Sequence, residues 1–253
     1  MGRVIEGESG KGSAMGAPRK IRILGLLQLL RPPNLFTVPG DPLCGALLTN
    51  GGRWSWHILP AVIVSLAAYC AGLVINDLAD YKEDLRDRPG RPLPSGAVPR
   101  GVALALAGVF VVIALAAAAF VNLVLLMLAG LLIAEILWYN LMAKKNPVIA
   151  PVAMGLCRGL SVLVGAAAIG PPPPLAITAA AVVALYIAVV TALARTETRN
   201  PRIPLLIGAL IRGLLFIQAG MCLLARGHGW IASLLLLALW PISRLVASRF
   251  YAS

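Results

Sequence analysis

The sequence contains unusually little charge for its length. Only 13% of its 253 residues are Asp, Glu, Lys or Arg, whereas 59% are hydrophobic. Soluble globular chains carry about 25% charged residues, so this chain lacks the side chains that would cover an ordinary water-facing surface. The scarcity of charge therefore argues against a soluble protein and predicts one all-α domain that lies in a lipid bilayer.

Acidic residues, cysteine and histidine are also few. There are 10 Asp and Glu against 22 Lys and Arg, with four cysteines and two histidines. The cysteines stand singly in apolar stretches without CxxC spacing, so we expect them to be buried packing residues. The basic excess does not predict nucleic-acid binding, because no basic patch is interleaved with aromatic residues. In a membrane protein, basic residues gather on cytoplasmic loops.

Long apolar runs determine the number of expected helices, since a spanning helix needs about 20 apolar residues. Residues 101–143 are twice this length and predict two helices that turn near Asn122. Residues 148–194 predict two more, separated by the prolines at positions 171–174. Further spans are expected at 26–48, 57–77, 205–225 and 230–248. These runs predict about eight transmembrane helices in one bundle.

The first predicted span contains the prolines 32, 33, 39 and 42. Proline removes a backbone hydrogen bond and clashes with the preceding turn of a helix. We therefore expect Pro39-Gly40-Asp41-Pro42 to break or kink the first span and to expose backbone to a cavity.

The positive charges predict the orientation of the bundle. With the N-terminus in the cytosol, the outer loops hold only Arg53 and Arg226, and nearly all other basic residues outside the spans lie in inner loops or tails. This asymmetry follows the positive-inside rule and places both termini in the cytoplasm, with a bacterial inner (cytoplasmic) membrane as the expected location. Residues 1–22 lack the apolar core of a signal peptide and are expected to form a disordered cytosolic tail before a membrane domain at 23–253.

The end of the second predicted span carries an acidic motif. It reads Asn76-Asp77-Leu78-Ala79-Asp80-Tyr81-Lys82-Glu83-Asp84. Asp77, Asp80 and Asp84 stand at i, i+3 and i+7, which places them on one helical face with Asn76 at its edge. Such neighbouring carboxylates repel one another, and Mg²⁺ would remove the repulsion while sharing substrate phosphates. The structural alternative is a solvated helix end whose carboxylates form surface ion pairs with the arginines that follow.

A proline-stiffened basic loop comes next. It reads Arg88-Pro89-Gly90-Arg91-Pro92-Leu93-Pro94-Ser95-Gly96. Arg88 and Arg91 would lie beside the metal, where a diphosphate needs donors, because a guanidinium binds phosphate through two parallel hydrogen bonds.

Taken together, NDxxDxxxD at the end of the second span and the RPLPSG segment after it resemble the UbiA superfamily of intramembrane prenyltransferases. The resemblance extends along the chain from Leu30, through Arg31-Pro32, to Tyr139 and Lys144 at the close of the fourth span. It implies a fold of membrane helices and transfer of a polyprenyl group from a polyprenyl diphosphate.

The resemblance also implies roles for individual residues. The metal-binding set would be Asn76, Asp77, Asp80 and Asp84, with the three aspartates as catalytic residues holding Mg²⁺ on the donor diphosphate. The substrate-binding set around the diphosphate would be Arg88, Arg91, Tyr139, Lys144 and Arg158. Arg158 resembles the family's basic residue in the substrate cavity, although pairing with an acid inside the bilayer is its structural alternative. Glu135 lies one turn before Tyr139 and is expected to orient its hydroxyl.

The sequence departs from the family at the second acidic motif. UbiA proteins carry a DxExD motif after the sixth helix, where this chain reads Arg195-Thr196-Glu197-Thr198-Arg199. One interpretation is that Arg195 and Arg199 bind phosphate in place of a second metal, while Glu197 is ion-paired or acts on the acceptor as a catalytic residue. The other is a loop that serves only the positive-inside rule. The family also usually has nine spans, against the eight expected here.

The expected function is therefore Mg²⁺-dependent transfer of a polyprenyl group to an acceptor within the membrane. The acceptor is not identified by the sequence and is commonly aromatic in the family. The expected partners are the polyprenyl diphosphate donor, this unknown acceptor and the lipid bilayer, without nucleic acid. Two alternatives stay open: phosphoribosyl-type transfer onto a polyprenyl phosphate, and a non-catalytic relative that binds or transports lipid.

Overall fold

The computed structural model describes residues 23–195 and 203–250, so the expected N-terminal tail at 1–22, Glu197 and Arg199 lie outside the described residues. The described residues contain helices and no strand, which confirms the all-α prediction. In chain order the helices are α1 (Ile23–Leu30), α2 (Pro32–Leu35), α3 (Gly40–Thr49), α4 (Ile58–Ala79), α5 (Tyr81–Asp87), α6 (Arg100–Ala119), α7 (Leu123–Leu141), the 3₁₀ turn η1 (Ala143–Lys145), α8 (Ile149–Ile169), α9 (Pro174–Ala194), α10 (Ile203–Leu224) and α11 (Gly229–Phe250).

Within the described ranges, seven helices are long and apolar enough to cross a membrane, namely α4 and α6 to α11. They correspond to seven of the eight expected spans. The predicted turn in the run 101–143 is present: Asn122 caps α7, and its Oδ1 accepts a hydrogen bond from the Leu125 N–H at 2.8 Å. The prolines at 171–174 separate α8 from α9 as expected, because successive prolines remove the backbone N–H groups that would continue α8, whereas Pro174 is tolerated at the first position of α9. The orientation in the membrane stays a prediction.

The expected first span at 26–48 is not one helix. It consists of the short helices α1, α2 and α3, with breaks at Arg31 and at residues 36–39. The second break lies mostly before the segment Pro39-Gly40-Asp41-Pro42, where a break was expected: only Pro39 is outside a helix, and Gly40, Asp41 and Pro42 form the first turn of α3. Arg31 adopts the left-handed conformation (φ 44°), and it precedes Pro32, whose ring disfavours helical backbone in the residue before it.

Glycines allow α3 to pack tightly on α8 in the middle of the bundle. A Cβ added to Gly45 would lie 1.9 Å from the Val162 carbonyl oxygen, and one added to Gly165 would lie 1.9 Å from the Pro42 carbonyl oxygen. The backbones of the two helices therefore touch, as small residues permit between membrane helices. This contact holds the broken first span beside α8, at the centre of the molecule.

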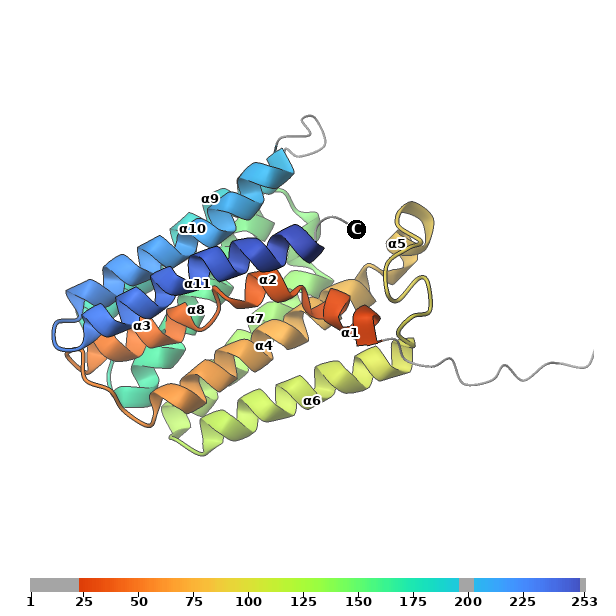
Figure 1. Ribbon diagram of the computed structural model, residues 1–253. Helices are drawn as coiled ribbons and strands as arrows, with labels where there is room; N and C mark the ends of the chain where they lie inside the picture. Colours follow the sequence, from red (N-terminus) through yellow and green to blue (C-terminus); the bar gives the residue numbers. More distant parts are fainter. Residues whose placement is uncertain (1–22, 196–202, 251–253) are drawn as a thin grey trace, which may run out of the picture.

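Figure 1 shows the long helices side by side, with α1 and α5 at one end of the bundle. The acidic residues of α4 and α5, the loop that follows, η1 and Arg195 meet at this end through hydrogen bonds and ion pairs. We call it the charged end.

Candidate functional site

The acidic motif lies where α4 passes into α5. Asp80 is the last residue before α5, and its N–H donates to the Asn76 carbonyl at 3.0 Å. The Asp84 N–H donates in turn to the Asp80 carbonyl at 2.9 Å, so helical hydrogen bonding continues across the junction. Asp77 and Asp84 are buried, whereas the Asp80 side chain is 26% exposed.

Arg91 joins the two buried carboxylates. Its Nη1 lies 2.8 Å from Asp84 Oδ2 and 3.9 Å from Asp77 Oδ1. Arg88 reaches only to within 4.0 Å of Asp84 and is largely exposed. The loop that carries both arginines is anchored by Leu93 and Val98, which are buried in a hydrophobic cluster with residues of α1, α4 and α6. The loop thus fixes Arg91 over the acidic motif and leaves Arg88 pointing outward.

Arg31 approaches the same acids from the break between α1 and α2. Its Nη2 donates to Asp77 Oδ1 at 2.8 Å. The left-handed backbone of a non-glycine residue is sparsely populated and occurs preferentially at functional sites. The sequence marked Arg31 only as part of a family resemblance, and its position before Pro32 was the available sign of a special conformation.

Lys144 reaches the acids from η1. Its ammonium donates to Asp80 Oδ1 and lies 3.5 Å from Asn76 Oδ1. Arg195, just after α9, donates from both Nη atoms to the Lys144 carbonyl at 3.2 Å. Arg195 is thereby tied to the acidic motif through η1. No sequence pattern indicated that Arg195 and Lys144 would be in contact.

Each of the three carboxylates forms its shortest ion pair with a different basic residue. Within the described parts of the chain, no three His, Cys, Asp or Glu side chains lie close enough together to hold a metal alone. The oxygen donors nevertheless fit Mg²⁺, because this ion binds one or two carboxylates and takes its other ligands from water and phosphate. The ion pairs use only the Oδ1 atoms of Asp77 and Asp80. The Oδ2 atoms of both carboxylates could therefore bind a metal ion.

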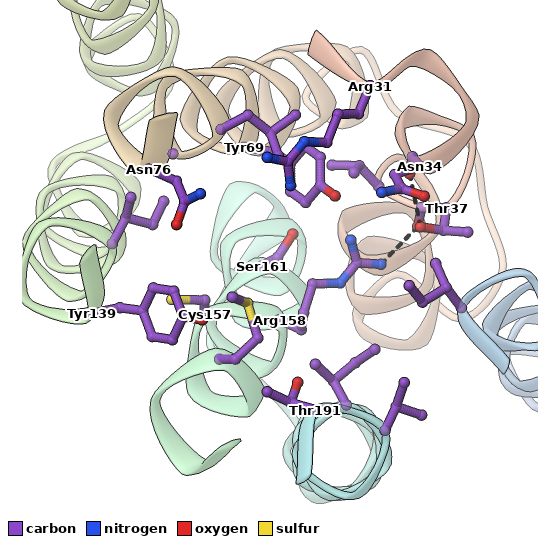
Figure 2. Close-up of a pocket in the computed structure, with 18 of the residues that line it drawn as sticks. Arg31, Asn34, Thr37, Tyr69, Asn76, Tyr139, Cys157, Arg158, Ser161 and Thr191 are labelled. Atoms are coloured by element: carbon purple, nitrogen blue, oxygen red, sulfur yellow. Dashed lines mark hydrogen bonds between the residues drawn. The ribbon is translucent and has the colours of Figure 1, made fainter. Parts of the chain in front are cut away.

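A cavity of about 300 Å³ opens among the helices next to this cluster. Arg31, Asn34 and Asn76 line it, together with apolar side chains of α4, α7, α8, α9 and α10 such as Leu73 and Ile136. Figure 2 shows Tyr69, Tyr139 and Arg158 placed around the space. Its volume falls at the lower end of the range of about 300–1,000 Å³ that small-molecule pockets occupy.

Arg158 belongs to a buried polar cluster on the wall of this cavity. Its Nε lies 2.7 Å from Asp41 Oδ2, and its Nη2 donates to the Thr37 carbonyl at 2.9 Å (Figure 2). Gln218 of α10 donates to the same carbonyl at 2.8 Å and to Asp41 Oδ1 at 2.6 Å. Pairing of opposite charges inside the bilayer was the structural alternative for Arg158, and the structure contains such a pair. Gln218 was missed, although a lone amide in an apolar span was a visible sign.

The expected link between Glu135 and Tyr139 is wrong. Glu135 Oε1 is buried without a hydrogen-bond partner among the described residues, and no hydrogen bond joins it to the Tyr139 hydroxyl. Tyr139 lines the cavity, whereas Glu135 is not among the residues that line it.

The fold and the site define a class of protein: a multi-pass integral membrane protein in which a charged cluster adjoins an apolar cavity between the helices. Residues 42–253 match the UbiA prenyltransferase family, and the chain belongs to that family. The family predicted from the acidic motif is therefore confirmed.

Similar proteins include digeranylgeranylglyceryl phosphate synthases. The one from Methanothermobacter thermautotrophicus is 33% identical over 148 residues, which cover 57% of this chain and 50% of that protein. The one from Haloquadratum walsbyi is 30% identical over 176 residues, 69% of this chain and 60% of that protein. The chain thus matches about half of the length of these archaeal relatives, and the expected bacterial inner membrane stays a prediction.

Solved structures share the fold. A structure of digeranylgeranylglyceryl phosphate synthase has a TM-score of 0.59 at 18% identity, covering 91% of this chain and 93% of that one. A UbiA homologue from Archaeoglobus fulgidus bound to DMAPP and Mg²⁺ also has a TM-score of 0.59, at 19% identity, covering 89% and 88% of the two chains. An apo UbiA homologue from Aeropyrum pernix K1 has a TM-score of 0.57 at 21% identity, covering 86% and 91%.

Proposed function

We propose that this chain transfers a prenyl group from a prenyl diphosphate to an acceptor inside the membrane. The observation that carries this proposal is the position of the cavity. Its apolar walls suit an isoprenoid chain, and its polar lining includes Arg31 and Asn76, which contact the acidic motif and Lys144. A diphosphate at the charged end would therefore lie at the mouth of a space that accepts its hydrocarbon tail.

The charged end supplies both kinds of group that a diphosphate requires. Asn76, Asp77, Asp80 and Asp84 would hold Mg²⁺, which stabilises negative charge on the departing diphosphate. Arg31, Arg91 and Lys144 now pair with carboxylates and would turn their remaining donors to phosphate oxygens. Arg88 is exposed enough to join them. Hydrogen-bond donors stabilise developing negative charge most strongly where apolar walls exclude water.

The proposed reaction breaks the bond between C1 of the prenyl group and the diphosphate oxygen, and the bonding electrons leave with the diphosphate. The acceptor hydroxyl oxygen then bonds to C1, and its proton passes to the released diphosphate. Tyr69 and Tyr139 line the cavity, and the electron-rich faces of their rings would favour a positive charge developing on the prenyl carbon.

The names of the relatives suggest a donor and an acceptor. Digeranylgeranylglyceryl phosphate carries two geranylgeranyl groups on a glyceryl phosphate. We propose geranylgeranyl diphosphate as the donor and a geranylgeranylated glyceryl phosphate, with one free hydroxyl, as the acceptor. An aromatic acceptor is the competing choice.

The test is a transfer assay with the full chain in lipid nanodiscs. Radiolabelled geranylgeranyl diphosphate and Mg²⁺ would be supplied with geranylgeranylglyceryl phosphate or with an aromatic acid, and products separated by chromatography. We expect labelled product with the glyceryl phosphate, its loss in Asp80→Asn, and normal activity in Asp87→Asn, which alters an exposed acid one turn beyond the motif.

Further arms of the same assay address the other functions. Product from phosphoribosyl diphosphate and a polyprenyl phosphate would instead identify phosphoribosyl-type transfer. Mg²⁺-dependent binding of the donor without product in any arm would identify a non-catalytic relative. Either result would overturn the proposal.

A further inference from the structure

Two arginines lie in apolar spans away from the cavity. Arg212 is in α10 and Arg244 is in α11, both within the stretches that are apolar enough to cross a membrane. Among the residues that the structure describes, neither forms an ion pair. Charged side chains inside a span are costly unless they meet a counter-charge or reach the interface, so this pair calls for an anionic partner.

An aromatic contact fixes how the two arginines lie relative to each other. Phe216 of α10 and Trp240 of α11 have ring centroids 5.8 Å apart, with planes tilted by 58°. Arg212 precedes Phe216 by four residues, and Arg244 follows Trp240 by four residues, so each shares a helical face with its ring. The Arg244 guanidinium lies 5.8 Å from the centroid of the Trp240 ring.

The helices run in opposite directions, so both arginines lie on the same side of the ring pair. The start of α10 and the end of α11 lie at the charged end of the bundle (Figure 1). Arg212 and Arg244 therefore stand about one turn, or ~6 Å, from the rings toward that end. The Arg212 side chain also extends this way, because a Cβ added to Gly208, one turn earlier, would lie 3.3 Å from Arg212 Nη1.

This face is separate from the cavity. Ile207 and Ile211 of α10 line the cavity, whereas Arg212 is turned by about 100° from Ile211. Phe216 is 51% exposed and Arg244 is exposed, so this face of α10 and α11 is open to the surroundings of the bundle. In a membrane, those surroundings are lipid.

We propose that Arg212 and Arg244 bind the phosphate of an anionic membrane phospholipid, in the leaflet at the charged end, with its acyl chains along Phe216 and Trp240. A guanidinium matches phosphate geometry through paired hydrogen bonds. Two of them complement a headgroup with net negative charge better than a zwitterionic one, whose own cation would be repelled. This inference is independent of the prenyl-transfer proposal.

Native mass spectrometry of the full chain tests the proposal without donor or Mg²⁺. The protein would be titrated in detergent with phosphatidylglycerol and, separately, with phosphatidylcholine. We expect a retained phosphatidylglycerol molecule, with Arg212→Gln/Arg244→Gln weakening its binding about tenfold or more. The phosphatidylglycerol affinity of Arg212→Lys/Arg244→Lys should lie between those of the wild type and the double glutamine variant, because lysine keeps the charge but lacks the planar fork of arginine.

The matched control is Lys82→Gln/Arg86→Gln, which removes two exposed charges of α5 at the same end of the bundle. It should bind phosphatidylglycerol as the wild type does. Equal binding by the Arg212/Arg244 double glutamine variant, or equal affinity of the wild type for both lipids, would overturn the proposal. Size-exclusion chromatography and thermal unfolding establish that each variant is folded.

Discussion

Arg158 and Asp41 form an ion pair in the interior of the bundle, with Arg158 Nε 2.7 Å from Asp41 Oδ2 and no exposed surface on Asp41. The pair lies where the first span is broken. Residues 36–39 are not α-helical, and Arg158 and Gln218 both donate to the Thr37 carbonyl. Irregular backbone at membrane depth is tolerated only where the protein satisfies its polar groups. Arg158 of α8 and Gln218 of α10 therefore satisfy the broken backbone, and the pair with Asp41 keeps Arg158 on the wall of the cavity.

Asp41→Leu should destabilise the protein strongly. It leaves the Arg158 guanidinium buried without its counter-charge, and breaking a buried pair in this way costs about 3–5 kcal/mol. Thermal unfolding in detergent would measure the loss. Ser161→Ala is the matched control, since it removes a buried but neutral hydrogen bond of 2.8 Å to Ser65, for which about 0.6 kcal/mol is typical between membrane helices. Equal melting temperatures for the two variants would contradict a stabilising role of the pair.

Arg195→Lys should weaken donor binding moderately. Both Nη atoms of Arg195 donate to the Lys144 carbonyl, and lysine keeps the charge but cannot form this double contact. Loss of a hydrogen bond of this kind costs about 0.5–1.5 kcal/mol, or roughly three- to tenfold in affinity. The measurement is a titration with a non-reactive prenyl thiodiphosphate.

Arg199→Lys, measured alongside, tests the second arginine of the altered motif. A loss of affinity in both variants would support phosphate binding by the arginine pair, and a loss in Arg195→Lys alone would support positioning of Lys144. Unchanged affinity in both would leave the arginines as topology signals.

Cysteine labelling should report opposite sides of the membrane for the two ends of the bundle. The native cysteines give little background, because Cys44, Cys70 and Cys222 are buried and Cys157 is partly buried. Gly90→Cys is suitable for the charged end, since nothing lies within 4 Å of a Cβ there. Arg53→Cys is suitable for the other end, whereas Gly52 is not, because a Cβ there would lie 2.0 Å from the Arg226 carbonyl oxygen. An impermeant maleimide applied to intact cells should label only Arg53→Cys; labelling of both would contradict the predicted topology.

The sequence predicted the long helices well, because each depends on a local signal. Apolar length defined the spans, and Asn122 and the prolines at 171–174 marked the turns. The two breaks in the first span were harder to place. Prolines indicated an interruption, but the positions of the breaks depend on distant partners, such as Asp77 for Arg31 and Gln218 for Thr37.

The sequence identified which residues form the candidate site better than it identified how they contact one another. Asp77, Asp80 and Asp84 were expected to face one cation, since spacing along a helix is a local property. The basic groups that separate them come from the α1–α2 break, the loop after α5 and η1, and spacing says nothing about such long-range contacts. The predicted Glu135–Tyr139 contact failed for a related reason: one helical turn brings two residues near each other along the helix, but it does not determine which of the two side chains lines the cavity, and only Tyr139 does.

Asp80→Asn should abolish most Mg²⁺-dependent donor binding and leave the protein folded. Asp80 is the most exposed of the three aspartates, and its one described ion pair is with Lys144. Asp77 is less suitable, because it is buried and paired with Arg31, so its replacement would also disturb the fold. The change from carboxylate to amide removes a charged group of the proposed Mg²⁺ site while preserving shape. We expect a loss of at least about 1.5–3 kcal/mol, or ten- to a hundredfold in affinity.

The measurement is calorimetric titration with the same prenyl thiodiphosphate, with Mg²⁺ and with EDTA. In the wild type, EDTA should weaken binding strongly; in Asp80→Asn, Mg²⁺ and EDTA should give nearly equal affinities. Asp87→Asn controls for removal of one negative charge from α5 and should retain the full Mg²⁺ effect. An undiminished Mg²⁺ effect in Asp80→Asn, with an unchanged melting temperature, would mean that Asp80 only pairs with Lys144 at the charged end.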